Sequence, residues 1–141
     1  MTHLVYESNF VKVAQGNLET YTLMGAREWN MPREIKESDW KVFRRLHQVA
    51  LERFCQRVIE EINDATSNCS EHYHERYLEV FDLIMDRNEK MARAFDDMSR
   101  SRAFLLLANI RQSQLLTDEE FSEFSVEARE AVASIFKIRR T

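Results

Sequence analysis

Glycine, proline and cysteine are scarce in this chain of 141 residues, which contains two glycines, one proline and two cysteines. Both glycines and the proline lie at or before Pro32, so nothing from Arg33 to Thr141 breaks a helix through its backbone chemistry. A β-rich fold needs turn residues along its whole length, and a helical fold does not. This distribution predicts an all-α fold.

The same scarcity argues against several classes of enzyme. Phosphate-binding loops are built from the backbone amides of glycine-rich turns, and the only glycines here are Gly16 and Gly25. A nucleophile-elbow glycine pattern and a paired-cysteine zinc motif are also absent from the sequence. We therefore expect no cofactor and, rather than an enzyme, a binding protein. Catalytic residues that converge only in the fold would leave no such motif.

Long apolar runs are missing as well. The longest, Ala103–Ala108, is far shorter than the ~20 residues that span a bilayer. The first residues show no basic segment followed by an apolar one, which a secretory signal would need. We expect a cytoplasmic protein that does not contact a membrane. Its Cys55 and Cys69 should remain reduced and partly buried, because a rise of ~1.5 Å per helical residue separates them beyond the ~7 Å limit of a disulfide.

The formal net charge is −4, without the basic surplus that is usual in proteins that bind many phosphates. Acidic residues interleave with the basic ones, which is typical of a solvated, ion-paired surface. We therefore do not expect nucleic acid as a partner, and a phosphate-binding surface is the alternative. The clustered basic residues are Lys41, Arg44, Arg45, Arg87, Lys90, Arg93, Arg100 and Arg102.

Residues 1–32 differ from the remainder of the chain. Two β-prone runs, 10–14 and 18–23, flank Gln15, Gly16 and Asn17, which suit a tight turn. This segment is predicted to form either a short β-hairpin or an extended arm, and residues 33–141 form the helical bundle domain.

Apolar residues at every third or fourth position predict two long helices. The first opens at Ser38, whose hydroxyl suits an N-cap beside Asp39, and runs to about Ala65. The second restarts after Ser70 and runs to about Met98. The short turn between them makes the pair an antiparallel hairpin. The predicted inward side chains are Trp40, Phe43, Leu46, Ala50, Phe54, Val58 and Ile62, and Tyr73, Tyr77, Val80, Ile84, Met91, Phe95 and Met98.

Two shorter helices complete a predicted antiparallel bundle of about four. The third, from about Ser101 to Leu116, is apolar on every side and should be buried on every side. Thr117 and Glu120 have the spacing of a capping box and start the fourth, which Ser125 interrupts if it acts as a second cap.

The best metal-binding candidates are Glu71, His72 and His74, because Glu71 and His74 lie three residues apart on one helix. A two-metal site needs a second such pair, and Arg44 stands three residues before His47 where a carboxylate would be required. The alternative is a solvated helix start, with His74 in a surface ion pair to Glu61 across the hairpin.

His47 and Asn88 interrupt the apolar faces of the two long helices at nearly equal distances from the turn. Because a buried polar group needs a partner, we predict that these two side chains hydrogen-bond to each other and fix the register of the hairpin. Helix curvature would separate them, and a pH-sensing or ligand-binding role is the remaining alternative.

Taken together, these patterns predict a non-enzymatic helical interaction or regulatory protein that binds itself, as a homodimer, or another protein. A metal- or cofactor-binding bundle and a nucleic-acid-associated factor are the alternatives.

Overall fold

The computed structural model describes residue 32, residues 34–67 and residues 72–140. Within these residues the chain is helical and forms no strand, which confirms the all-α prediction. The elements are α2 (Glu37–Ser67), α3 (Tyr73–Phe95), the short 3₁₀ helix η1 (Arg100–Arg102), α4 (Ala103–Gln112), α5 (Asp118–Ser122) and α6 (Val126–Arg140). The predicted arm or hairpin before Pro32, and Cys69, lie outside the described residues.

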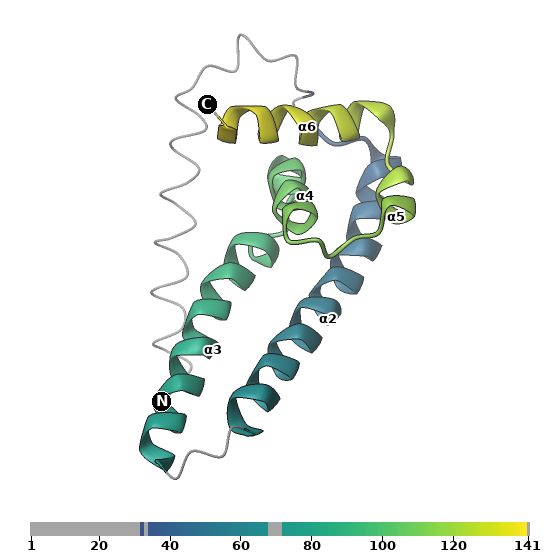
Figure 1. The fold of residues 1–141 in the computed structure, drawn as a ribbon. Helices are drawn as coiled ribbons and strands as arrows, with labels where there is room; N and C mark the ends of the chain where they lie inside the picture. The colour runs from purple at the N-terminus through teal and green to yellow at the C-terminus, as the bar shows by residue number, and fades with distance from the viewer. Residues whose placement is uncertain (1–31, 33, 68–71, 141) are drawn as a thin grey trace.

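The two long helices, α2 and α3, run antiparallel and pack together as predicted (Figure 1). Helix α2 begins one residue before the predicted cap and ends two residues after Ala65. Helix α3 ends at Phe95, three residues before the predicted end, because Asp97 adopts a positive φ of 53°. Aspartate tolerates this left-handed conformation better than most residues, so the backbone leaves the helix there.

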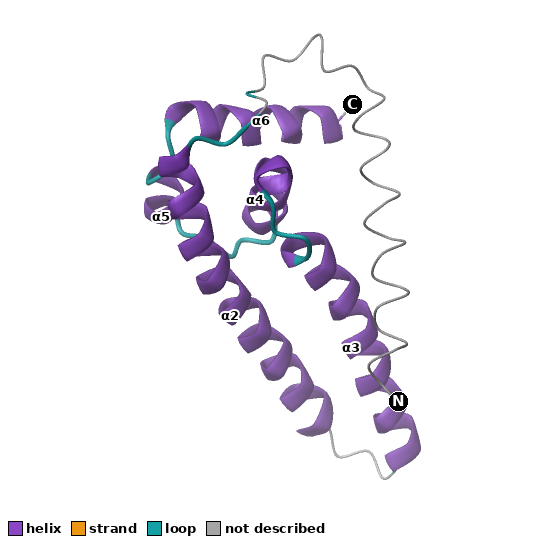
Figure 2. Cartoon of the chain, turned by 180° about the vertical axis from the view of Figure 1, so that it is seen from behind, coloured by secondary structure: helices purple, strands orange, loops and turns teal. Residues whose placement is uncertain are grey.

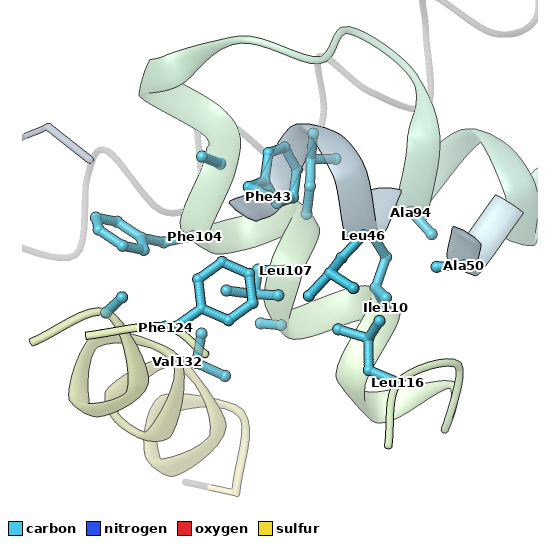
Figure 3. Packing of buried hydrophobic residues seen from close by; sticks show 14 of the residues in the cluster. Phe43, Leu46, Ala50, Ala94, Phe104, Leu107, Ile110, Leu116, Phe124 and Val132 are labelled. Atoms are coloured by element: carbon cyan, nitrogen blue, oxygen red, sulfur yellow. The ribbon is translucent and has the colours of Figure 1, made fainter. Parts of the chain in front are cut away.

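Helix α4 lies between the ends of α2 and α3 that are farther from their connection, and α6 crosses above it (Figures 1 and 2). Leu106, Leu107 and Ile110 are each at most 1% exposed, so the predicted burial is confirmed for most of this apolar segment, although Leu105 is only half-buried. The close view shows Leu107 and Ile110 among labelled side chains that include Leu46 of α2 and Val132 of α6 (Figure 3). The hydrophobic core is therefore concentrated at one end of the hairpin.

Helix α4 is shorter than predicted, ending at Gln112 rather than near Leu116. Gln114 has a φ of 55°. Its N–H donates to the Arg111 carbonyl at 3.0 Å and the Leu115 N–H to the Ile110 carbonyl at 3.3 Å, the two bonds of a Schellman motif. Glycine usually occupies the left-handed position, so a glutamine there gave no signal for the end of the helix.

The segment predicted as one last helix is split into α5 and α6, and both local signals in it are confirmed. Thr117 and Glu120 form the capping box at the start of α5. The Ser125 hydroxyl accepts a 3.2 Å hydrogen bond from the Ala128 N–H and so caps α6.

A buried carboxylate joins this second cap to α2. Asp39 is 3% exposed, and it accepts hydrogen bonds from the Ser125 N–H at 2.8 Å and from the Ser125 hydroxyl at 2.6 Å. The sequence suggested only a favourable position near the helix N-terminus for Asp39. The structure gives it a second role, which is to connect the first turns of α2 and α6.

Arg53 of α2 holds the start of α5. Its guanidinium binds both carboxylate oxygens of Glu120, at 2.7 and 2.9 Å, and the Leu115 carbonyl at 3.0 Å. The hydrogen bonds from Arg53 lower the pKa of Glu120 from 4.5 to about 2, against the opposing effect of burial. A carboxyl with a lowered pKa stabilises the folded state above its unfolded pKa.

We expect Glu120→Gln to lower the free energy of unfolding by about 1–2 kcal/mol at pH 6, allowing for solvent screening of the partly exposed pair. Glutamine retains the capping interaction, so the difference reports the ion pair. That difference should shrink as pH falls below about 4.5 and vanish near pH 2, in urea titrations across this range. In an Arg53→Gln background the same substitution should cost little at any pH, and an undiminished cost there would contradict the assignment.

Candidate functional site

The end of the hairpin away from the core has few buried side chains. We call residues 51–67 of α2 and 73–91 of α3 the stalk (Figure 2). No stalk residue is fully buried, although Leu51, Phe54 and Met91 at the inner end of the stalk pack against the core. Two helices alone bury only the strip along which they touch, so the remaining apolar surface of the stalk faces solvent.

Five large apolar side chains on α3 are exposed together. Tyr77 is 66% exposed, Phe81 51% and Met85 44%. We call this surface the α3 face, and its members are Tyr73, Tyr77, Leu78, Phe81 and Met85. Its ends, Tyr73 and Met85, are twelve positions apart, which is about 18 Å along a helix.

The α3 face continues along the same side of α3 into apolar residues that are buried in the core. Ala92 lies seven residues after Met85, and Phe95 lies fourteen after Phe81, so each shares a side of the helix with its partner. Ala92 and Phe95 are buried at the core end. The face is therefore the part of this apolar surface that no described segment of the chain covers. The prediction that Tyr73, Tyr77 and Met98 point inward was wrong, because all three side chains are exposed.

Ion pairs and hydrogen bonds hold the two stalk helices together. Arg87 of α3 pairs with Glu61 of α2, and the hydrogen bonds from Arg87 lower the pKa of Glu61. Arg76 donates to the Thr66 carbonyl near the tip, and its guanidinium lies 5.4 Å from the centre of the Tyr73 ring. These polar interactions hold α3 against α2 and leave the α3 face exposed to solvent.

Of the metal-binding candidates, His72 and His74 are exposed, and Glu71 lies outside the described residues. Among the described residues, no three histidine, cysteine or acidic side chains are grouped closely enough to hold a metal ion. The ion pair expected between Glu61 and His74 is replaced by the pair of Glu61 with Arg87. Metal binding that includes Glu71 stays a prediction.

His47 is half-buried between the rings of Phe43 and Phe95. Its Nε2 lies 3.2 Å from the Phe95 carbonyl oxygen, a partner that the sequence did not suggest. This carbonyl belongs to the last turn of α3, where carbonyls lack helical partners. Burial lowers the pKa of His47 from its ordinary value of 6.5, and the bond to Phe95 opposes that effect. The predicted pairing of His47 with Asn88 stays a prediction.

The clustered basic residues mostly have acidic partners. Arg45 pairs with Glu123, Arg100 with Glu37, and Arg102 with Asp97. The others that lie within ion-pair distance of a carboxylate are Arg87, Lys90 and Arg93. Such pairing is what the interleaved charges predicted, and it leaves little free positive charge for a phosphate-binding surface.

The shallow hollows on the surface of the described residues include two with partly polar linings. One lies along a single helix, α2, and is lined by residues that include Gln48, Cys55 and Ile59. Cys55 is a free thiol and is exposed rather than partly buried as expected. The other lies between Arg111 and Arg139, whose guanidiniums already bind Asp118 and the side chains of Gln112 and Asn109. Neither hollow collects free polar groups that converge on one point, as a catalytic site requires.

Comparison with models of protein families, with curated proteins and with solved structures finds no match for this chain. Among the helices that the structure describes, none has both the length and the apolar character needed to cross a bilayer. The candidate functional site is therefore chosen from the structure alone, and it is the exposed apolar surface of the α3 face.

Proposed function

We propose that this protein is a non-enzymatic interaction protein that binds another protein chain through the α3 face. One observation carries the proposal, namely that Tyr73, Tyr77, Leu78, Phe81 and Met85 are exposed side by side on a stalk without buried residues. Single exposed apolar residues are common on surfaces, but contiguous exposed apolar surface marks interaction sites. Tyrosine, phenylalanine and methionine are also the types enriched in protein interfaces.

A photo-crosslinking experiment tests this proposal. The photoreactive residue p-benzoylphenylalanine is placed at position 81, where it resembles the native Phe81, or at Val126 of α6, which is 56% exposed and far from the stalk. After irradiation of cells, we expect a discrete product of higher mass from position 81 and none from position 126. Adding Tyr77→Ala should reduce the yield several-fold, and adding Met98→Ala, another exposed apolar residue, should not.

The products distinguish the possible occupants of the face. Crosslinking to a different protein supports the proposal. In the purified protein, a product of twice the 16.8 kDa chain mass would identify a second copy, as the predicted homodimer requires. A product within one chain, mapped by peptide sequencing to residues 1–31, contradicts the proposal, as does an equal yield from position 126.

A further inference from the structure

The α3 face is bordered on one side by carboxylates. Glu75 lies three residues before Leu78 and Asp82 four residues after it, while Glu89 lies four residues after Met85. Residues three or four apart are neighbours on a helix surface, so these acids form a row beside the apolar one. All three are exposed, and the apolar face therefore has an acidic border.

Little positive charge offsets this border. Glu75 and Asp82 form no ion pair within the described part of the chain, and Glu89 is 3.9 Å from Arg93. The nearby Arg76 is committed to the Thr66 carbonyl and the Tyr73 ring. Opposite charges across an interface favour the correct partner, and like charges exclude wrong ones.

The negative charge of the acidic border favours some binding partners of the α3 face over others. A second copy that binds antiparallel through the same face would bring one row of carboxylates against the other. A nucleic acid or an anionic membrane surface would meet the same repulsion. A chain that carries lysine or arginine beside its apolar residues would be attracted.

The two-helix shape of the stalk indicates that the partner segment is itself a helix. Two packed helices leave apolar surface exposed, here the α3 face, and a third helix laid against it would complete a compact three-helix unit. A face about 18 Å long matches about three turns of helix. We propose that the partner segment is an amphipathic helix with lysine or arginine beside its apolar stripe, and that it packs along the α3 face. This inference rests on the proposed function.

Two synthetic helical peptides test the charge preference. Both are 18 residues long, with leucine at heptad positions a and d and alanine at b, c and f. One carries lysine and the other glutamate at positions e and g. In fluorescence anisotropy titrations of the full chain at low salt, we expect the lysine peptide to bind at least tenfold more tightly. Its affinity should fall as salt rises, because exposed charges are screened.

Substitutions test whether the acidic border of the α3 face causes the preference for the lysine peptide. Glu75→Gln with Asp82→Asn should reduce the advantage of the lysine peptide to less than threefold. The matched control, Glu119→Gln with Glu130→Gln, changes one exposed acid in a first helical turn and one in a helix interior, and should leave the advantage intact. Circular dichroism confirms that each variant is folded.

The outcomes separate the inference from the proposed function. If Tyr77→Ala with Phe81→Ala abolishes binding of both peptides while the acidic border has no effect, the α3 face is a binding surface without a charge preference, and the inference is wrong. It is also wrong if neither peptide binds at 100 μM, whereas the photo-crosslinking result decides the proposed function independently.

Discussion

Replacing Leu107 with alanine is expected to lower the free energy of unfolding by about 3–4 kcal/mol. Leu107 is 1% exposed and lies in the middle of α4, the helix that α2, α3 and α6 all contact. The close view places it between labelled side chains of α2 and α6 (Figure 3). Removing three carbons there leaves a cavity that rigid neighbours on several sides fill only in part.

Leu105 provides a matched control for this prediction, since it lies on the same helix and is only half-buried. Leu105→Ala should cost about 1–1.5 kcal/mol, because part of its side chain already contacts water. Urea titrations at one pH measure both values. Equal costs at the two positions would mean that α4 is not the centre of the core.

Asp39→Asn is expected to destabilise the protein by about 2–3 kcal/mol. The buried carboxylate accepts two hydrogen bonds, from the backbone N–H and the hydroxyl of Ser125. An asparagine amide has one oxygen, and its NH₂ group would face a donor. One buried donor would lose its partner, and the first turns of α2 and α6 would lose part of their connection.

A double-mutant cycle separates this contact from other effects of Asp39. In a Ser125→Ala background, the hydroxyl donor is gone and Asp39→Asn should cost at least about 1 kcal/mol less. Asp64→Asn, at an exposed position on the same helix, should change stability by less than about 0.5 kcal/mol. Costs that simply add for Asp39 and Ser125 would show that the two residues do not act together.

Local sequence patterns predicted much of this fold. The absence of helix breakers and the spacing of residues such as Phe43 and Leu46 identified the long hairpin. The Thr117–Glu120 capping box and the Ser125 cap marked two helix starts, because each depends on residues within one turn. The uniformly apolar segment that became α4 was correctly expected to be buried.

The errors concern properties that depend on distant parts of the chain. Periodicity showed which side of α3 is apolar but not how far the core extends along it, so Tyr73 and Tyr77 were assigned inward. The carbonyl that pairs with His47 became accessible only because α3 ends at Phe95. The role of Asp39 depends on a residue 86 positions away, which no local pattern reveals.

The contacts between α2 and the α5–α6 region also constrain the order in which the chain can fold during synthesis. Lys36, Asp39 and Arg45 bind Glu127, Ser125 and Glu123, which lie 91, 86 and 78 positions later. A ribosome therefore releases the hairpin and the apolar α4 before the residues that enclose them exist outside the exit tunnel. For that interval α4 lacks its α6 cover, so its apolar side chains are open to contact with other chains.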